Sequence, residues 1–232
     1  FVDIVAVGYN EAAKSFGKAK RVVYTGNPVR PDVLVDSRAE GRQFFGLCDD
    51  IFTVLIAGGS RGARTINTAM IDVHKHFQGK PGIKLIHITG NGEYNTVLEQ
   101  LGIDDGTGLG ESSLILPYLH DMPKALAATD LAVFRSGAIG LAELAVRGIP
   151  SILVPYPYAA EDHQTYNARI FVQEGAAHMI VDKVLTSHDL IGEIEMFMAN
   201  RELLAQMGAS ALRLGKPNAA HDIAELALSI AK

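Results

Sequence analysis

The sequence contains 232 residues, 48% of them hydrophobic and 20% charged, with a formal net charge of −5 at pH 7. This length and apolar content fit one α/β domain with a full core, alone or with part of another domain, and the mixed charges indicate no nucleic-acid-binding surface. The single cysteine, Cys48, excludes a disulfide framework and indicates a reducing cytosol, and no apolar run reaches the roughly 18–20 residues of a membrane span.

The first fifty residues differ from the rest of the chain. The sequence begins at Phe1 inside an apolar run, which predicts that the natural N-terminus is missing. Residues 25–32 read TGNPVRPD, and prolines behind a Gly-Asn pair are typical of turns and linkers. We therefore expect residues 1–24 to be the tail of a preceding domain and residues 25–35 to be an interdomain linker.

From residue 52 onward, short apolar runs rich in β-branched residues alternate with helical patterns such as 63–77 and 138–147. With two further runs near the N-terminus, the predicted strands span residues 3–7, 21–25, 52–57, 84–89, 112–116, 131–134, 151–154 and 177–181. Strands that are apolar on both faces and joined by helices predict an α/β fold, a parallel sheet with helices on both faces. From residue 187 only helices are expected, and Asn218 is the predicted cap of the last one.

The run FTVLIAGGSRGARTIN (52–67) ends a predicted strand in a glycine turn, residues 58–62, and leads into a helix. Glycines permit the positive φ of a tight turn and let backbone N–H groups approach a ligand, and the helix N-terminus attracts anions. Ser60 adds a hydroxyl, and Arg61 and Arg64 add charge that faces either the ligand or solvent. The turn therefore predicts a phosphate site; the alternative is an ordinary strand-to-helix turn that binds nothing.

The surrounding sequence narrows the kind of phosphate. No Gly-Lys-Ser/Thr follows the turn, so it is not a Walker A loop. A dinucleotide fold also needs an acid at the end of the next strand, but KLIHITGNG (84–92) has none. Glu93 comes directly afterwards and is expected inside the following helix, so an NAD site is disfavoured.

A second glycine turn, at Ser136 and Gly137, lies between the predicted strand 131–134 and the helix 138–147. Two such turns at the carboxyl edge of one sheet can hold two ends of one ligand. Glu143 lies one to one and a half turns into this helix, among small and apolar residues. We interpret it as a carboxylate that accepts two hydrogen bonds from a ribose; the alternative is a solvated glutamate near a favourable helix dipole.

The third segment, residues 151–175, is a predicted strand, a proline-containing loop and a helix. Asp162 is a candidate N-cap of that helix. His163, Gln164 and Asn167 follow it, and such neutral side chains both donate to and accept from sugar hydroxyls. The segment therefore predicts a sugar site on the same edge of the sheet as the two glycine turns.

No metal site is predicted. His163 has no second His or Cys at ligand spacing, His74 and His76 are too close to share a helix face, and there is no Asp-x-Asp motif. His87, on a predicted strand, is expected to be packed in the core, and His120 is expected near the active edge.

Together these segments resemble the MurG family of bacterial wall synthesis, whose members transfer N-acetylglucosamine from UDP-N-acetylglucosamine to undecaprenyl-pyrophosphoryl-muramoyl-pentapeptide, converting lipid I to lipid II. The resemblance covers nearly the whole chain and rests on TGNPVR (25–30), GGSRGARTIN (58–67), PYLHDMPKALAATDLAVFRSGAIGLAEL (117–144), GIPSILVPYPYAAEDHQTYNA (148–168) and KPNAAHDIAEL (216–226). It implies the C-terminal half of a two-domain, GT-B-type inverting glycosyltransferase with Rossmann-like domains. Residues 36–232 would be the UDP-sugar donor-binding domain, and residues 1–24 the tail of the N-terminal acceptor domain.

The resemblance also implies roles for single residues. Arg30 and Ser60 would contact the diphosphate-sugar, and Glu143 would hold the ribose. Residues 138–140 would form the second phosphate turn, and residues 163–164 would lie at the N-acetylglucosamine hydroxyls. With the glycine turns and the third segment, the residues predicted to bind the UDP-sugar are Arg30, Gly59, Ser60, Gly62, Ser136, Gly137, Ala138, Ile139, Glu143, His163, Gln164 and Asn167.

The chain departs from many members of the family at Gly140, where they have Thr, and from some at His163, where they have Gln. The resemblance places the general base in the acceptor domain, so no catalytic residue is predicted here, and the chain alone is expected to bind UDP-sugar weakly and to transfer nothing. No cofactor is expected to be obligatory, because UDP-N-acetylglucosamine is a substrate. The implied partners are this donor, the undecaprenyl-linked muramoyl-pentapeptide acceptor and the inner face of the cytoplasmic membrane, to which the protein would bind peripherally.

Three alternatives remain open at the level of sequence. The first is a related UDP-sugar transferase with a glycolipid acceptor such as a diacylglycerol. The second is a UDP-sugar 2-epimerase, and the third is a nucleotide-sugar-binding module without catalysis.

Overall fold

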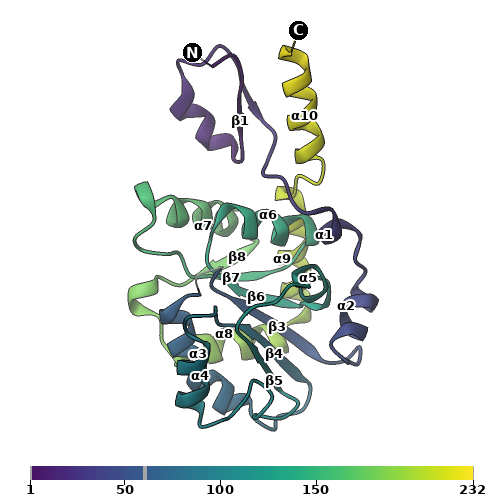
Figure 1. Ribbon diagram of the computed structural model, residues 1–232, viewed down its shortest axis with the longest axis vertical. Coiled ribbons are helices and arrows are strands. Elements are labelled where there is room, and N and C mark those ends of the chain that lie inside the picture. The colour runs from purple at the N-terminus through teal and green to yellow at the C-terminus, as the bar shows by residue number, and fades with distance from the viewer. Residues whose placement is uncertain (1, 60–61, 232) are drawn as a thin grey trace.

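The computed structural model describes residues 2–59 and 62–231. Its main body is a parallel sheet with the strand order β5-β4-β3-β6-β7-β8 (Figure 1). These strands are β3 (Phe52–Ala57), β4 (Ile83–Ile88), β5 (Ser113–Leu116), β6 (Leu131–Phe134), β7 (Ser151–Leu153) and β8 (Ala177–Met179). The chain runs outward from β3 to β5 and then returns to the other side of β3 with β6. Open α/β sheets bind ligands at such a switch point, outside the carboxyl ends of the strands.

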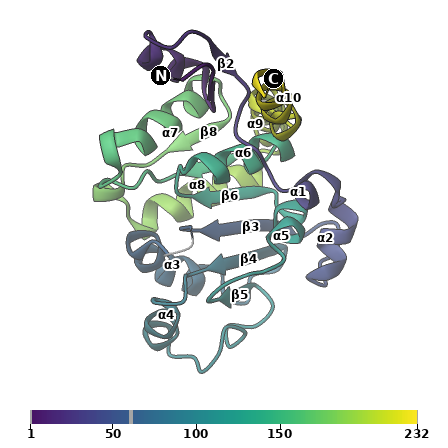
Figure 2. The same cartoon turned by 45° about the horizontal axis from the view of Figure 1, so that its top comes forward.

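Helices cover both faces of this sheet (Figure 2). They are α3 (Arg64–Phe77), α4 (Tyr94–Leu101), α5 (Met122–Ala128), α6 (Ala138–Arg147), α7 (His163–Gln173), α8 (Ser187–Ala199) and α9 (Arg201–Leu214). On β3, Val54 and Ile56 pack with α3 and α8, whereas Leu55 and Ala57 pack with α5 and α6. Both faces of the strand are therefore buried, which explains why its sequence is apolar at every position except Thr53 rather than alternating.

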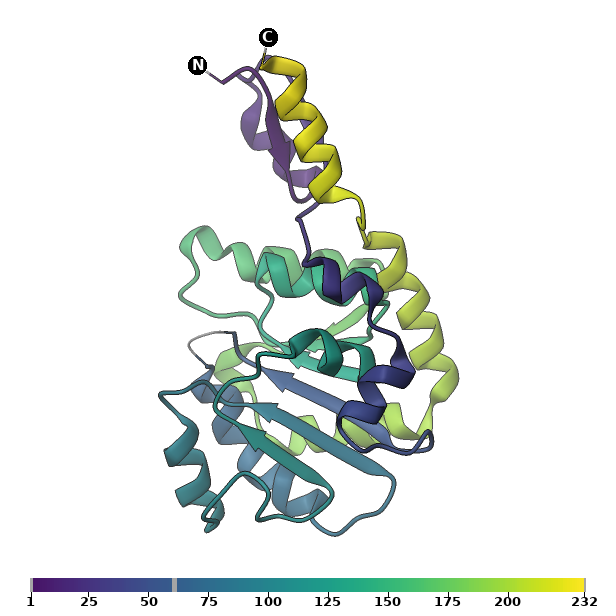
Figure 3. The same cartoon turned by 45° about the vertical axis from the view of Figure 1, so that its right-hand side comes forward.

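The N-terminal segment forms a separate small unit. It consists of β1 (Val5–Val7), the 3₁₀ segment η1 (Asn10–Phe16) and β2 (Val22–Tyr24), and the two strands pair in parallel with each other. The last helix, α10 (Ala219–Ile230), lies beside this unit and away from the six-stranded sheet (Figure 3). The ammonium group of Lys216, just before α10, lies 4.7 Å from the ring centroid of Tyr24 and joins the two segments.

Two short helices connect this unit to the sheet. Residues 31–35 of the predicted linker form α1 (Pro31–Val35), where proline at the first helical position fixes a helical φ. α2 (Arg38–Phe44) follows and begins with a capping box between Ser37 and Glu40. The buried side chain of Val33 packs into the α5–α6 layer, so part of this segment is docked on the domain.

The predicted fold class is confirmed, and all eight predicted strands are present with bounds shifted by no more than two residues. The predicted helix 138–147 has the same bounds as α6, and Gly148 ends it in the left-handed conformation.

The capping prediction for Asn218 is wrong. This residue precedes α10, but its backbone has φ −92° and ψ 6°, and its side chain makes no capping hydrogen bond. An extended backbone is what normally brings a capping side chain back to the helix N–H groups.

Candidate functional site

A cavity of about 450 Å³ opens at the carboxyl edge of the sheet. Its floor is formed by Ala57 and Ile88, at the ends of β3 and β4. Its walls include Arg30, Glu143 and residues 117–119 of the loop after β5. A volume of this size is typical of sites for small molecules.

The two predicted glycine turns lie next to each other at this edge. Ala57 is paired with Phe134 across β3 and β6, so the turns that follow these two strands emerge side by side. In the first turn, Gly59 and Gly62 have φ values of 87° and 77°, which confirms the predicted positive φ. A Cβ atom at Gly62 would lie 2.2 Å from the carbonyl oxygen of Thr89, so the turn packs tightly against the end of β4.

Three residues of the predicted first phosphate turn give no evidence of a ligand contact. Ser60 and Arg61 fall outside the part of the chain that the structure describes. Arg64 is exposed, and its Nη2 lies 3.0 Å from Oε1 of Glu93. Glu93 directly precedes α4, so the acid expected inside the helix stands at its start and binds this arginine.

The second turn leads into α6 with Gly137 at the cap position and Ala138 as the first helical residue. The first amides of a helix have no carbonyl partner inside it, and its dipole is positive at this end. Ile139 is 56% exposed and lines the cavity. The N-terminus of α6 therefore presents backbone donors beside the cavity, and phosphate contact by residues 138–140 stays a prediction.

Arg30 and Glu143 are joined by an ion pair. Nε and Nη2 of Arg30 each lie 3.1 Å from Oε1 of Glu143, across 113 residues of sequence. Glu143 is only 6% exposed, whereas the Arg30 side chain is 49% exposed. A buried carboxylate needs a partner, and the half-exposed guanidinium provides one while orienting it toward the cavity wall. Two residues predicted separately as ligand contacts thus form one unit.

Three other predicted contacts connect the second turn to α7. Oγ of Ser136 donates to the carbonyl of Gln164 at 2.8 Å, and Nδ2 of Asn167 donates to the carbonyl of Ser136 at 3.1 Å. Ser136 and Asn167 are both buried. Oε1 of Gln164 accepts from the backbone N–H of Tyr156 at 3.0 Å, which fixes the loop before α7. These bonds position the loop and helix, and ligand contact by the three residues stays a prediction.

The start of α7 differs from the expected cap. Asp162 has φ 52° and follows Glu161 with φ 53°, so two residues other than glycine are left-handed in succession. The carboxylate of Asp162 makes no hydrogen bond to the helix backbone and accepts from Oγ1 of Thr165 at 2.6 Å. The capping prediction is therefore wrong, because a left-handed backbone turns the side chain away from the first amides. His163 is exposed, and its Nδ1 donates to the carbonyl of Ala160 at 2.8 Å.

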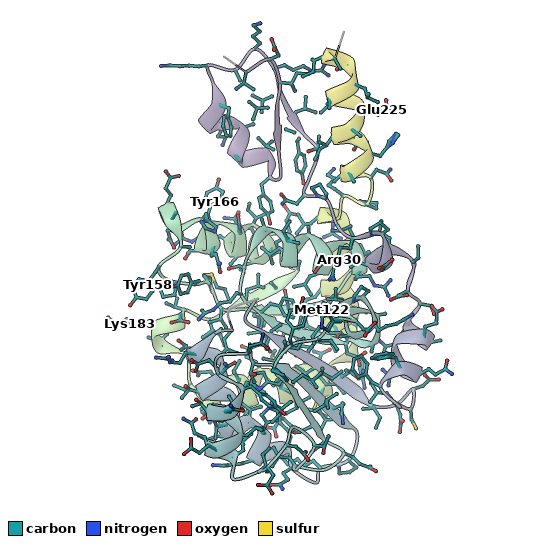
Figure 4. The ribbon with its side chains drawn as sticks, in the orientation of Figure 1. Arg30, Met122, Tyr158, Tyr166, Lys183 and Glu225 are labelled. Atoms are coloured by element: carbon teal, nitrogen blue, oxygen red, sulfur yellow. The ribbon has the colours of Figure 1, made fainter. Side chains whose placement is uncertain are left out.

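The apolar wall of the cavity was not predicted from the sequence. Tyr118, Leu119 and Met122 line it, from the loop after β5 and the first residue of α5. Figure 4 shows Met122 close to Arg30 and apart from Tyr158. Their position directly after the carboxyl end of a predicted strand could have indicated these residues, but only His120 was predicted to lie near the active edge in this loop. His120 itself is exposed and packs edge-on against Tyr118.

The histidines of the core form a directed hydrogen-bond chain. Nδ2 of Asn67 donates to the carbonyl of Thr89, so its Oδ1 accepts from Nε2 of His87 at 3.0 Å. Nδ1 of His87 must then accept from Nε2 of His74 at 3.1 Å, and Nδ1 of His74 accepts from Oγ of Ser113 at 2.8 Å. Burial lowers the pKa of His74 to about 4 and that of His87 well below its usual value. The prediction that His87 is packed in the core is confirmed.

Within residues 2–59 and 62–231, no group of three His, Cys, Asp or Glu side chains could hold a metal ion. In the same residues no helix has the length and apolar character needed to cross a bilayer.

Comparison with known proteins gives a family match. The glycosyltransferase family 28 C-terminal domain matches residues 53–226. Two curated relatives, from Desulforamulus reducens and Desulfitobacterium hafniense, are 41% and 43% identical to the chain over 225 and 231 residues. Both are named UDP-N-acetylglucosamine--N-acetylmuramyl-(pentapeptide) pyrophosphoryl-undecaprenol N-acetylglucosamine transferase. The alignments cover 96% and 100% of this chain, and the chain spans 60% and 63% of these relatives.

Solved structures show the same fold. MurG from Acinetobacter baumannii is 26% identical, with a TM-score of 0.73 that covers 99% of this chain and 61% of that one. A putative UDP-N-acetylglucosamine 2-epimerase from Listeria monocytogenes is 18% identical, with a TM-score of 0.65 over 92% of this chain and 55% of the other. At that identity the second match concerns the fold alone.

Proposed function

The chain belongs to the glycosyltransferase family 28 C-terminal domain family, and on that premise we propose that it is the donor-binding half of an inverting N-acetylglucosaminyltransferase. The donor is UDP-N-acetylglucosamine, and the acceptor is the undecaprenyl-pyrophosphoryl-muramoyl-pentapeptide lipid of peptidoglycan synthesis. The names of the curated relatives and of the A. baumannii structure support this activity. The enzyme would work peripherally at the inner face of the cytoplasmic membrane, where such a lipid is available.

The observation that carries the proposal is the position of the site at the switch point of the sheet. The pairing of Ala57 with Phe134 brings two glycine turns together, and the buried carboxylate of Glu143 stands beside them in a cavity with apolar walls. The site therefore offers two anion sites, an acceptor for a diol and an apolar surface. A ligand in which a diphosphate joins a nucleoside to a sugar needs these features in the same order.

The donor fits the site in parts. The uracil lies against Met122 and Leu119, and its ribose hydroxyls donate to Glu143. The diphosphate lies at the amides of the first turn and of residues 138–140. The N-acetylglucosamine extends toward residues 163–164 at the start of α7. Ser60, in the first turn, belongs to this proposal from the sequence alone.

The domain division is part of the proposal. Residues 36–232 form the donor-binding domain, residues 25–35 the interdomain segment, and residues 1–24 the tail of an acceptor domain. The separate two-stranded sheet of β1 and β2 supports the boundary after residue 24, because those strands do not join the six-stranded sheet.

The chemistry proposed is a single displacement. The C4 hydroxyl of the muramoyl acceptor attacks C1 of the donor sugar, the bond from C1 to the diphosphate oxygen breaks, and UDP leaves with inversion. The leaving diphosphate gains charge, which the two helix N-termini and Arg30 stabilise. Removing one such preorganised donor from an active site typically raises the barrier by about 2.7–4 kcal/mol. The base that takes the acceptor proton comes from the acceptor domain, so this chain alone transfers nothing.

Calorimetric titration of the chain with UDP-N-acetylglucosamine, UDP-glucose, UDP and NAD tests the proposal. We expect the UDP compounds to bind and NAD to bind more weakly than UDP or not at all. Preferential binding of NAD would refute the proposal. A free 2-epimer in the NMR spectrum, formed from UDP-N-acetylglucosamine without an acceptor, would assign the chain to the epimerases instead.

A further inference from the structure

A largely buried carboxylate outside all of the motifs connects the three loops of the proposed site. Asp182 begins the short 3₁₀ segment η3 (Asp182–Val184), which follows β8. Its side chain is 12% exposed, and it forms an ion pair with Arg135, whose side chain is 9% exposed. Its second oxygen, Oδ2, accepts from Oγ1 of Thr65 at 3.1 Å. Neither Asp182 nor Thr65 lines the cavity, so the carboxylate acts through other residues.

Each partner of Asp182 belongs to a different loop. Thr65 is the second residue of α3, directly behind the first glycine turn. Arg135 directly follows β6 and precedes the second glycine turn. Nη1 of Arg135 also donates to the carbonyls of Val154 at 3.0 Å and Pro155 at 3.1 Å, at the start of the third loop. One carboxylate thus bridges the first turn of α3 and the residue that precedes the second glycine turn.

The third loop is held through the same arginine. The guanidinium of Arg135 lies 5.6 Å from the ring centroid of Tyr156, and the N–H of Tyr156 donates to Oε1 of Gln164. Figure 4 shows Lys183, the neighbour of Asp182, on the same side of the molecule as Tyr158 and away from Met122, against which the uracil is proposed to lie. The network therefore supports the diphosphate and sugar end of the site and not the nucleoside end.

Stability alone gives little reason for such a pair. Taking two charges out of water costs several kcal/mol per ion, and buried ion pairs often add no net stability relative to apolar residues. They do fix geometry, because each charge must keep its partners. We propose that Asp182 is a positioning residue that sets the spacing of the two glycine turns and the third loop for a diphosphate. This inference rests on the proposed function and assigns a role in it to a residue that contacts no part of the donor.

The test compares ligands that use different ends of the site. Dissociation constants of uridine and UDP are measured by NMR titration for the chain and for Asp182→Asn, with Asp104→Asn on an exposed loop as the matched control. We expect Asp182→Asn to raise the Kd of UDP about tenfold, equivalent to about 1.4 kcal/mol, and that of uridine less than about twofold. General loosening of the fold would weaken both ligands alike, so an equal loss for uridine and UDP would overturn the inference.

A second pair of variants guards against a folding defect in Asp182→Asn. Thr65→Val removes only the bond from α3, whereas Thr65→Ser keeps the hydroxyl. We expect the valine variant to weaken UDP about threefold and the serine variant to bind as the unchanged chain does. In the double variant, Thr65→Val should add nothing to Asp182→Ala, because Asp182→Ala has already removed the carboxylate that accepts from Oγ1 of Thr65. Full additivity, or unchanged UDP binding in both single variants, overturns the role of Asp182 while the proposed function stands. If the unchanged chain binds no UDP, the proposed function fails and the inference fails with it.

Discussion

Replacing Glu143 by glutamine tests the ribose assignment most directly. The substitution keeps the shape of the side chain and removes its charge. In the ligand-free protein, the lost interaction is the ion pair in which two nitrogens of Arg30 lie 3.1 Å from Oε1. Because the Arg30 side chain is 49% exposed, water can take over its solvation. We therefore expect the free energy of unfolding to fall by no more than about 1 kcal/mol, as for other half-exposed pairs.

The effect on the ligand should be larger. Hydrogen bonds to a charged acceptor contribute about 1.5–3 kcal/mol each, and bonds between neutral groups about 0.5–1.5 kcal/mol. If two ribose hydroxyls donate to the carboxylate, the change to a neutral amide weakens binding by about 2 kcal/mol in total. That corresponds to an increase of about thirtyfold in the Kd of UDP.

Calorimetry with UDP and with 2′,3′-dideoxy-UDP separates this effect from others. The dideoxy compound lacks both hydroxyls, so its Kd should be the same for the unchanged chain and for Glu143→Gln. Glu225→Gln is the matched control, since Glu225 is exposed on α10, far from the cavity (Figure 4). An equal loss of affinity for UDP and the dideoxy compound would refute the ribose assignment and leave Glu143 as a residue that only orients Arg30.

Three further predictions concern the turn, the core and metal dependence. Gly62→Ala should lower the free energy of unfolding, measured in urea, by at least about 1–2 kcal/mol more than Gly46→Ala. Both glycines have positive φ, but only at Gly62 does a Cβ meet a backbone oxygen. Equal losses would contradict the close packing of Gly62 on Thr89. Burial lowers the pKa of His74 from 6.5 in the unfolded chain to about 4 in the folded protein, so between these pH values the unfolded chain binds more protons. The contribution of His74 to the free energy of unfolding is therefore complete above pH 6.5 and is lost as the pH falls toward 4. Lowering the pH from 7 to 5 should cost about 2 kcal/mol through this residue, and His74→Gln should show a smaller pH dependence than the unchanged chain in urea unfolding; an unchanged dependence would contradict this assignment. Titration of UDP with and without EDTA should give the same Kd, and a loss of affinity in EDTA would show that a metal takes part in binding.

The sheet could be predicted from sequence because burial on both faces leaves a strong signal. β3 reads FTVLIA, with every residue buried, and the glycine turn behind it marks where the strand ends. The same holds for β6, whose four residues are all buried. Continuous apolar runs bounded by glycine are hard to mistake in a parallel sheet. The two glycine turns that follow these strands were predictable for the same reason, and phosphate binding by them stays a prediction.

The contacts between segments could not be predicted in this way. Arg30 and Glu143 were both identified, but their ion pair spans 113 residues and depends on how α1 docks near α6. Asp182 stands in no motif, and its partners are distant in the sequence. The cap predicted at Asp162 was wrong because residue preference cannot report a left-handed backbone that the surrounding loop imposes.

The strand order also has a consequence for synthesis on the ribosome. β3 pairs with β4 on one side and with β6 on the other, and residues 58–130 must be made before β6 exists. At 5–20 residues per second this takes roughly 4–15 s. For that time the nascent chain carries a strand that is apolar except for Thr53 and has at least one open edge, which is the kind of segment that pairs wrongly with other chains. Slow translation through residues 58–130 would therefore lengthen the period in which this strand can aggregate.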